Sequence, residues 1–402
     1  MESSTSEQAS NRVAAMLSES KLVAFDHTAA GHDGISSNAS GSLIIKPCTQ
    51  AEIDFYESAR DHPLFQAHMP AYLGSLTRHD DQEAVAPLLE SSQDGVAAPS
   101  LADAVAAQGA ATQGTPGLNR RVSWKPSGGK KISTGLAIVL ENVASGFKHP
   151  NVLDVKLGAR LWDDDAPLAK RRKLDEVAAK TTSGLLGIRV AGMKLWAGAG
   201  TEPSAEVEVT PAERQYVEVK NGYKSYNKFY GQSLSVDNVA DAFKTYLGGV
   251  REDDSADDTT TRTRVRFKHP RAEFLIRRFL RELKSVRFLL EDEESRMYSA
   301  SVLMVYEGDP ETLEASIAKE EESVREAEHG TVDPSGDEDG DWDEEDEDEE
   351  EDEEDVQPYK IHELRLIDFA HARWTPDEGP DENALIGIQS LQGILERLVE
   401  YE

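Results

Sequence analysis

Asp154 and Lys156 lie two residues apart in the apolar segment 150–158, whose sequence is PNVLDVKLG. Alternate side chains of a β-strand point to the same face, so this carboxylate and this ammonium would lie side by side. The two groups could line one wall of a binding cleft, or they could form a structural ion pair. A surface ion pair would not need Gly158 two residues later, but the residues alone leave both interpretations open.

Lys46 lies near the end of the short apolar segment 42–47, and Glu52 lies early in the next predicted helix. A lysine that is held by a carboxylate in this way could contact the phosphates of a nucleotide. A surface lysine at the end of a strand would give the same pattern. The spacing of the two residues does not decide between these interpretations.

Asp368 follows Leu366 and Ile367 at the end of a predicted buried strand, and His371 lies just beyond it. Carboxylate oxygens are suitable ligands for a hard cation such as Mg²⁺. An aspartate at this position can also cap a helix or close a hydrogen-bonded turn. A metal site and a local capping role are therefore both open.

A basic cluster, KRRK, occupies residues 170–173. In a helix, Lys170, Lys173 and Lys180 lie within one sector of the surface, where their ammonium groups could bind phosphates. A solvated helix face and a nuclear import signal are the alternatives. We favour phosphate contact because the cluster closely follows the segment that carries Asp154 and Lys156.

Several common catalytic motifs are missing from the sequence. It contains no G-x-x-x-x-G-K-[ST] loop, no G-x-G-x-x-G turn, no C-x-x-C pair, no G-x-S-x-G elbow and no H-R-D catalytic loop. These absences argue against a P-loop enzyme, a dinucleotide dehydrogenase, a zinc protein, a serine hydrolase and an ordinary protein kinase.

Hydrophobic periodicity predicts the elements that must position these residues. The expected strands are 42–47, 134–143, 186–196, 298–306 and 362–369, and the expected helices are 51–60, 167–180, 235–247, 270–290, 312–328 and 384–399. Ser235 is the expected N-cap of the third helix. No internal repeat is present.

This order of elements predicts an α+β, bilobal fold with a small N-terminal lobe and a larger C-terminal lobe. We expect a disordered tail at 1–21 and an N-lobe at 22–143 with a flexible insertion at about 78–131. The C-lobe would span 144–402, with a phosphate-binding helix at about 167–180 and a disordered acidic insertion at about 329–357.

The chain has 402 residues and a formal net charge of −33, and the run from Asp337 to Asp355 is acidic at every position except Gly340 and Trp342. An acidic average disfavours direct binding of nucleic acid, although a local cluster of basic residues can still bind a polyanion. The single Cys48 cannot form an internal disulfide, so we expect a reducing compartment. No apolar stretch is long enough to predict insertion into a membrane.

Three motifs together resemble the inositol polyphosphate kinase family. They are the spacing of Pro150, Asp154, Lys156 and Gly158, the strand from Ser301 with the Val-Tyr-Glu-Gly segment 305–308, and IDFAH at 367–371. The similarity extends to segments 31–34, 43–56, 184–196 and 379–391, and it is greatest to fungal multikinases of the family. The resemblance implies a bilobal kinase-like fold related to protein kinases and ATP-grasp enzymes.

The resemblance also implies a nucleotide site for ATP. Lys46 would bind the ATP phosphates with Glu52 supporting it, and Asp154 would hold the ribose hydroxyls. Backbone groups of Glu141 and Val143 would contact the adenine.

For the inositol phosphate, the resemblance implies that Lys156 bridges the substrate and the transferred phosphoryl group. Asp368 would bind Mg²⁺, with Ser301 as a further candidate ligand, although Ala300 departs from the serine pair that is common in the family. His371 would contact the inositol phosphate, and Lys170 and Lys173 would add positive charge there. A loose phosphoryl-transfer transition state needs mainly positioning and charge neutralisation, so the missing H-R-D base is not an obstacle.

The expected activity is phosphorylation of inositol 1,4,5-trisphosphate to the tetrakis- and pentakisphosphate. Formation of pyrophosphates from inositol hexakisphosphate is the alternative activity. A different alternative is a scaffold whose acidic run, from Asp337 to Asp355, binds basic proteins; the same run could also be a solvated loop without a partner. We expect a monomer in the nucleus and cytoplasm.

Overall fold

The computed structural model describes residues 23–25, 34–77, 134–198, 213–251, 265–267, 271–329 and 360–400. The chain divides into two compact units. The first comprises Met1–Phe25, Asp33–Ile53 and Tyr72–Glu141, and the second comprises Asp26–His32, Asp54–Ala71 and Asn142–Glu402. The expected tail, the expected insertion at 78–131, the acidic run and residues 31–33 lie outside the described residues.

The first unit contains a five-stranded antiparallel sheet in the order β1-β2-β3-β5-β4. Leu43 and Ile45 of β3 pack with Ala137 and Val139 of β5, so alternate residues of β3 are buried and Lys46 lies on the opposite face. The strands are β1 (Val23–Ala24), β2 (Ser36–Ser37), β3 (Leu43–Pro47), β4 (Tyr72–Thr77) and β5 (Leu136–Glu141).

Helix α2 (Gln50–Ser58) begins after Thr49, whose hydroxyl accepts a hydrogen bond from the Glu52 N–H at 3.3 Å. The helix continues into the second unit, where η1 (Ala59–Asp61) and α3 (Pro63–Gln66) follow. Phe55 stacks on Phe369 and Trp374 at ring-centroid distances of 5.0 and 4.7 Å. This aromatic packing explains why segment 54–71 belongs with residues far along the chain.

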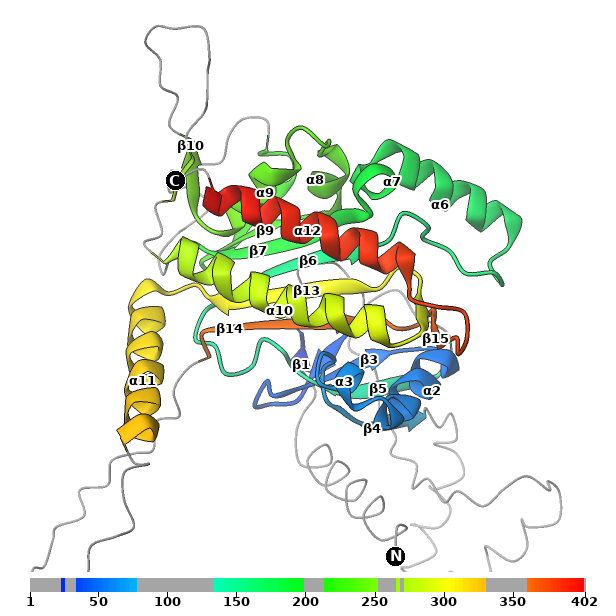
Figure 1. Ribbon diagram of the computed structural model, residues 1–402, viewed down its shortest axis with the longest axis horizontal. Helices are drawn as coiled ribbons and strands as arrows, with labels where there is room; N and C mark the ends of the chain where they lie inside the picture. Colours follow the sequence, from blue (N-terminus) through cyan, green and yellow to red (C-terminus); the bar gives the residue numbers. More distant parts are fainter. Residues whose placement is uncertain are drawn as a thin grey trace, which may run out of the picture. The chain divides into compact units, whose positions relative to one another are not determined.

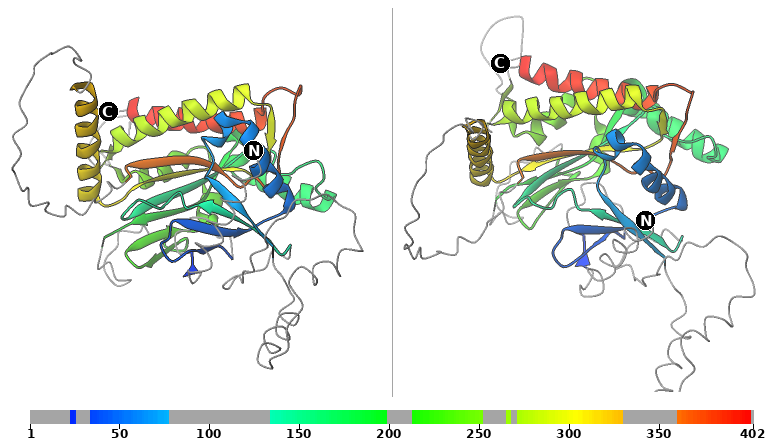
Figure 2. Two further views of the ribbon diagram at one scale, coloured as in Figure 1. Left: turned by 90° about the horizontal axis from the view of Figure 1, so that it is seen from below. Right: turned by 60° about the horizontal axis from the view of Figure 1, so that its bottom comes forward.

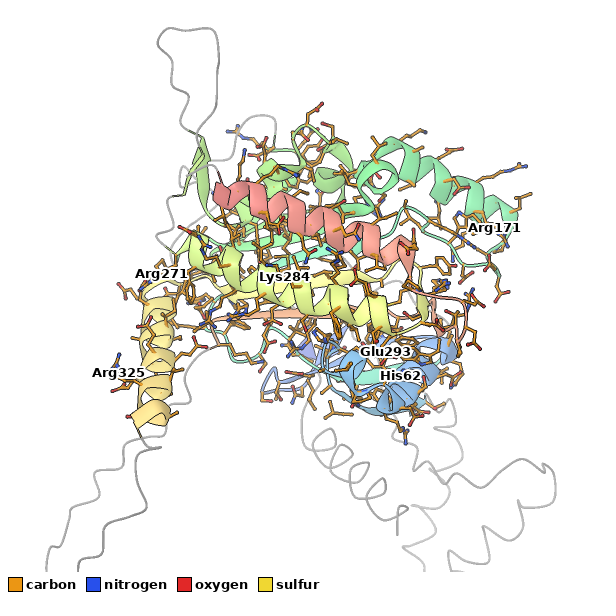
Figure 3. All side chains as sticks on the ribbon, in the orientation of Figure 1. His62, Arg171, Arg271, Lys284, Glu293 and Arg325 are labelled. Carbon is orange, nitrogen blue, oxygen red and sulfur yellow. The ribbon has the colours of Figure 1, made fainter. Side chains whose placement is uncertain are left out.

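An ion pair also fixes segment 54–71 within the second unit. His62 lies 2.6 Å from Glu293, measured from Nδ1 to Oε2, and Figure 3 labels both side chains where they meet.

The second unit is built on a six-stranded antiparallel sheet in the order β14-β13-β6-β7-β9-β8. Strand β6 holds the segment PNVLDVKL and has β13 and β7 as its two neighbours. The six strands are β6 (Pro150–Leu157), β7 (Ile188–Trp196), β8 (Val217–Lys220), β9 (Tyr223–Tyr226), β13 (Ser301–Glu307) and β14 (His362–Ile367).

Two long helices, α10 (Ala272–Asp292) and α12 (Glu382–Glu400), lie side by side across one face of this sheet (Figures 1 and 2). Leu157 of β6 packs against Gly387 of α12, so Leu157 and the alternate residues Val155 and Leu153 face the helices. Asp154 and Lys156 alternate with those side chains and therefore lie on the opposite face of the sheet. The sheet thus presents its charged residues away from the helical layer.

The remaining elements of the second unit are shorter or more peripheral. Two small antiparallel pairs join β10 to β11 and β12 to β15. Their bounds, with those of the other helices, are β10 (Gly249–Arg251), β11 (Val265–Phe267), β12 (Ser295–Met297), β15 (Ala372–Trp374), α6 (Leu168–Lys180), α7 (Thr182–Leu186), α8 (Lys228–Ser233), α9 (Val239–Tyr246) and α11 (Pro310–His329). No helix among the described residues is long and apolar enough to cross a membrane.

The structure corrects the expected start of the helix at 235–247. Helix α9 begins at Val239, and Asn238 occupies the N-cap position that we expected for Ser235. The Asn238 side chain accepts a hydrogen bond from the Ser235 N–H at 2.7 Å, and this local turn delays the start of the helix.

All five expected strands are shorter than predicted, and the backbone conformation explains two of them. Ser299 and Asp368 have positive φ angles of 62° and 69°, so β13 starts at Ser301 and β14 ends at Ile367. The sequence did not predict the hairpin of β8 and β9, because those strands are only four residues long.

Candidate active site

Three neighbouring strands of the second unit bring Lys156, Ser301 and Ile367 into one row. Ser301 of β13 pairs with Lys156 of β6 on one side and with Ile367 of β14 on the other. The Lys156 Nζ lies 3.6 Å from Asp368 Oδ2 and donates to the Ser299 carbonyl oxygen at 3.1 Å. The side chains of Lys156 and Asp368 are 21% and 11% exposed, so the pair is mostly enclosed but still accessible.

The backbone conformation of Asp368 turns the chain sharply at the end of β14. A φ of 69° is a left-handed conformation that aspartate tolerates better than most residues with a side chain. The next residue, Phe369, is fully buried against Phe55 and Phe65, which fixes the peptide. Asp368 is therefore a carboxylate held in place by the packing of its neighbour.

Asp154 is 3% exposed, and Arg189 of β7 is the basic residue opposite this part of β6. Arg189 pairs with Lys156 in the sheet, and a bulge between Asp154 and Val155 shifts the register beside it. Burial lowers the pKa of the Arg189 guanidinium, and the nearby Asp154 carboxylate acts in the opposite direction. Within the described residues, Nη1 of Arg189 is buried without a hydrogen-bond partner. Asp154 thus has a guanidinium beside it as well as Lys156.

Gly158 of the PNVLDVKLG segment is required by the side chain of Asn383. Its φ is +93°, and a Cβ at this position would lie 2.3 Å from Asn383 Nδ2. Asn383 accepts from the Arg160 N–H at 2.8 Å and donates to the Arg160 carbonyl oxygen at 3.0 Å. The glycine therefore leaves room for Asn383, at the N-terminus of α12, to fix the backbone of the segment that follows β6.

The segment after β14 meets helix α6 at His371. The Nδ1 of His371 lies within ion-pair distance of Asp163 Oδ2, and the Lys170 Nζ lies 3.4 Å from its Nε2. Lys170 and Lys173 are both exposed. The structure thus brings Lys170 to His371, while Lys173 projects from the same helix.

In the first unit, the Lys46 Nζ donates to Glu52 Oε1 at 2.8 Å, as the sequence predicted. The Lys46 side chain is 12% exposed and that of Glu52 is 2% exposed. Burial raises the pKa of the neighbouring Cys48 thiol to about 12, so the thiol stays protonated and uncharged at neutral pH. The lysine is thus held by a carboxylate rather than left at the surface.

Glu141 ends β5 opposite Leu43, and Val143 follows it in the second unit. The Val143 side chain is buried in a cluster with Phe147, Val152 and Val305. Its backbone N–H and carbonyl form no backbone hydrogen bond among the described residues, and a ligand could use them.

Residues 137–396 match the family described as inositol polyphosphate kinase, which is more than half of the chain. The chain belongs to the inositol polyphosphate kinase family. It is therefore a kinase.

This family member is similar to relatives of two kinds. It is 32% identical to the inositol polyphosphate multikinase of Saccharomyces cerevisiae over 388 residues, which covers 92% of this chain and 96% of that protein. It is 28% identical to inositol hexakisphosphate kinase 3 of Mus musculus over 274 residues, or 66% of this chain and 51% of that protein.

A solved structure confirms the predicted α+β kinase-like fold. The crystal structure of the inositol phosphate multikinase Ipk2 from S. cerevisiae, in complex with ADP and Mn²⁺, has a TM-score of 0.53 and 27% sequence identity. The match covers 89% of this chain and 100% of that one.

The residues at the strand ends of this kinase fit a divalent cation in part. The Asp368 carboxylate is partly exposed, and its oxygens are of the type that Mg²⁺ prefers. Ser301 is fully buried, and its hydroxyl has no hydrogen-bond partner among the described residues, so an ion could reach it only if neighbouring groups moved. No cluster of three or more His, Cys, Asp or Glu that could hold a metal occurs within the described ranges. Asp368 fits as it stands, with water and phosphate oxygens completing the coordination.

Four residues of this site were not predicted from the sequence: Arg189, Asn383, Asp163, and Asp164, which pairs with Arg160 and Arg373. Arg189 is placed by the register of β6 and β7, and Asn383 contacts Arg160 from more than 200 positions along the chain. No local sequence pattern predicts either contact. The run of three aspartates from 163 to 165, next to a basic cluster, was the one available signal for the others.

Proposed function

We propose that this chain is an ATP-dependent inositol polyphosphate multikinase that phosphorylates inositol 1,4,5-trisphosphate to the tetrakis- and pentakisphosphate. The observation that carries the proposal is the pair of Lys156 and Asp368, 3.6 Å apart at the ends of β6 and β14, the two strands that flank β13. The similarity to the yeast multikinase over nearly the whole of both chains supports it.

The roles proposed for the nucleotide-binding residues follow the family, one residue at a time. Lys46, held by Glu52 at 2.8 Å, would neutralise phosphate charge. Asp154 would accept hydrogen bonds from the ribose hydroxyls, and the backbone of Glu141 and Val143 would contact the adenine. The ADP and Mn²⁺ in the yeast Ipk2 structure support this use of a nucleotide and a divalent ion.

Phosphoryl transfer would depend on Lys156. Its ammonium, oriented by Asp368 and the Ser299 carbonyl, would contact both the attacking hydroxyl and the transferred group. A preorganised cation stabilises the charge of a loose transition state without reorganisation during the reaction. A magnesium ion held by Asp368 would neutralise further charge on the phosphates when bound.

The inositol phosphate would be bound through His371, Lys170 and Lys173. Asp163 fixes the orientation of the His371 ring, which leaves Nε2 toward Lys170 and a ligand. The exposed lysines of α6 would add positive charge. Because a lysine side chain is flexible, its ammonium could reach phosphates at different positions of the ring.

Formation of pyrophosphates from inositol hexakisphosphate is the second candidate activity. The similarity to the mouse hexakisphosphate kinase favours it, although this chain matches only about half of that protein. The two activities share the nucleotide site and differ in the substrate that the basic groups accept.

Radiolabelled inositol 1,4,5-trisphosphate, incubated with ATP, Mg²⁺ and the purified protein, tests the proposal when the products are separated by HPLC. We expect tetrakis- and pentakisphosphate from the wild type and neither from Lys156→Ala. A folded wild type that leaves this substrate unchanged but converts inositol hexakisphosphate would favour the second activity, and conversion of neither would contradict both.

The partners and location stay predictions. We propose that the protein is a monomer and is located in the nucleus and cytoplasm. Lys170, Arg172 and Lys173 are exposed on α6, where an import receptor could bind them. The acidic run from Asp337 to Asp355 would bind basic proteins, a role independent of catalysis. Deleting it should leave kinase activity intact and abolish retention on a column of immobilised histones; an inactive, folded deletion variant would contradict the separation.

A further inference from the structure

Two arginines outside the predicted substrate site share one aspartate. Arg160, which follows β6, and Arg373 of β15 both form ion pairs with Asp164 in the loop before α6. The Arg373 Nη2 lies 3.1 Å from Asp164 Oδ2, while Arg160 uses the other carboxylate oxygen. The side chains of Arg160, Arg373 and Asp164 are 36%, 44% and 61% exposed, so all three face solvent.

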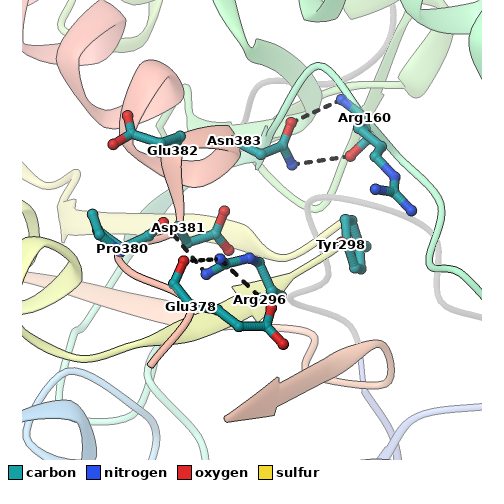
Figure 4. Close-up of a pocket in the computed structure, with 8 residues that line it drawn as sticks. All are labelled: Arg160, Arg296, Tyr298, Glu378, Pro380, Asp381, Glu382 and Asn383. Carbon is teal, nitrogen blue, oxygen red and sulfur yellow. Dashed lines mark hydrogen bonds and ion pairs between the residues drawn. The ribbon is translucent and has the colours of Figure 1, made fainter. Parts of the chain in front are cut away.

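Aromatic rings set the position of both guanidinium groups. The Cζ of Arg160 lies 4.0 Å from the ring centroid of Trp162 and 4.8 Å from that of Tyr298. The Cζ of Arg373 lies 5.6 Å from the Tyr298 centroid. Figure 4 shows Arg160 and Tyr298 together on the wall of a cavity of about 370 Å³. Stacking on rings leaves the edges of the guanidinium groups available for hydrogen bonds.

The arginine pair adjoins the residues proposed to bind the inositol phosphate. The Tyr298 N–H donates to the His371 carbonyl oxygen at 3.1 Å, and the next residue, Ser299, accepts from Lys156. Asp164 follows Asp163, which holds His371. The two guanidinium groups therefore extend the basic surface of Lys156, Lys170 and His371.

Asp164 is a partner that a phosphate can replace. Ion pairs between exposed side chains contribute little to stability, because water and salt screen them. A phosphate group carries more charge than a carboxylate and offers three oxygens, which suit the bidentate geometry of arginine. The hydrogen bond from Arg160 also lowers the pKa of the Asp164 carboxyl, so Asp164 is ionised over the whole neutral range.

We propose that Arg160 and Arg373 bind a further phosphate group of the inositol polyphosphate, and that Asp164 occupies them until that phosphate displaces it. This inference rests on the proposed function, since it assigns one more phosphate contact to the same substrate. It predicts that affinity rises with the number of phosphates that the ring carries.

Equilibrium binding without ATP tests the arginine pair separately from catalysis. Isothermal titration of the full-length protein with inositol 1,4,5-trisphosphate, the 1,4,5,6-tetrakisphosphate and the hexakisphosphate gives three affinities. Arg373→Gln should bind the more phosphorylated ligands about tenfold more weakly, because it loses one charge-assisted contact with a phosphate. Arg373→Lys should lose less, because it keeps the charge. Arg277→Gln is the matched control, an exposed arginine paired with Glu273 on α10, and should bind as the wild type does.

Asp164→Asn separates binding from a structural role. If Asp164 competes with phosphate, removing its charge should tighten binding about threefold to tenfold, because the arginines are released. If the bridge only stabilises the loop, Asp164→Asn would weaken binding as Arg373→Gln does.

Unchanged or weaker binding by Asp164→Asn, or wild-type affinity of Arg373→Gln for all three ligands, would overturn the proposal. The wild type and the variants could show the expected differences in affinity while the wild type transfers no phosphate. That result would contradict the proposed function but not the proposed role of the arginine pair. A wild type that binds none of the three would contradict both.

Discussion

The ion pair of Lys156 with Asp368 and that of Arg373 with Asp164 have the same charges but different surroundings. The first pair is 21% and 11% exposed and sits on a row fixed by strand register, whereas the second is 44% and 61% exposed and joins a short strand to a loop. Enclosed charges interact strongly and are costly to leave without a partner, while exposed charges are screened. The enclosed pair therefore suits a fixed catalytic geometry, and the exposed pair suits exchange with a ligand.

Asp368→Asn should break the enclosed pair with the largest effect. We expect kcat to fall about a thousandfold, because the ammonium loses its orientation and the cation loses its ligand. Asparagine also tolerates the left-handed backbone, so the fold should persist. Single-turnover phosphoryl transfer measures the effect, and circular dichroism checks the fold. A loss smaller than tenfold would place Asp368 outside the chemistry.

Gly158→Ala should disturb the support of the enclosed pair rather than its charges. The added Cβ would collide with Asn383, so we expect a loss of about 2 to 5 kcal/mol in the free energy of unfolding. Urea denaturation measures this loss. Gly379→Ala is the matched control, because Gly379 also has a positive φ but has no atom within 4 Å of the added Cβ. Equal losses in both variants would attribute the effect to backbone strain alone.

Arg189→Met tests whether the buried guanidinium acts through Asp154. We expect KM for ATP to rise about tenfold, because Asp154 loses the positive charge that lies beside it. The KM for 2′,3′-dideoxy-ATP should change little, since that nucleotide lacks the hydroxyls assigned to Asp154. Steady-state kinetics with both nucleotides gives the comparison, and Arg189→Lys serves as the charge-conserving control. An equal rise with both nucleotides would indicate a general structural role.

Glu320→Gln should have the smallest effect on the free energy of unfolding. It measures the contribution of an exposed ion pair that binds no ligand. Arg278 donates to Glu320 at 3.0 Å, and this hydrogen bond lowers the pKa of the Glu320 carboxyl. The Glu320 side chain is 43% exposed, so the expected loss is less than about 1 kcal/mol at neutral pH.

The pH dependence of that loss follows from the lowered pKa. The unfolded chain binds the proton more readily, so the contribution is complete above about pH 4.3 and disappears as pH falls through the lower, folded pKa. Urea denaturation of both proteins between pH 7 and about pH 3 measures it. A difference that grows as the pH falls would contradict this assignment.

Much of the fold could be predicted because it depends on local patterns. The strands that carry Lys46 and Lys156 and the strand that ends before Asp368 are apolar runs, and α6 and α10 show helical periodicity. The family and the kinase activity could be predicted from three motifs and are confirmed. The Lys46–Glu52 contact could be predicted because both residues belong to one strand-helix unit.

The rest depends on contacts between distant segments. Nothing in the sequence near Arg189 shows that it lies opposite Lys156, because β6 and β7 are joined through two helices. The pairing of Asp164 with Arg373 requires β15 to meet the loop before α6. The roles of the predicted site residues in binding and catalysis stay predictions until the variants are measured.

The antiparallel pairing of β13 with β14, from Ser301 opposite Ile367 to Tyr306 opposite His362, has a consequence for the length of the chain between them. The two strands are held together by their own ladder of hydrogen bonds, so their pairing does not depend on the length of the chain between them. The entropy of closing a loop grows slowly, by about 0.6 kcal/mol for each doubling of its length. The kinase can therefore gain or lose many residues between α11 and β14 while Asp368 and His371 keep their places.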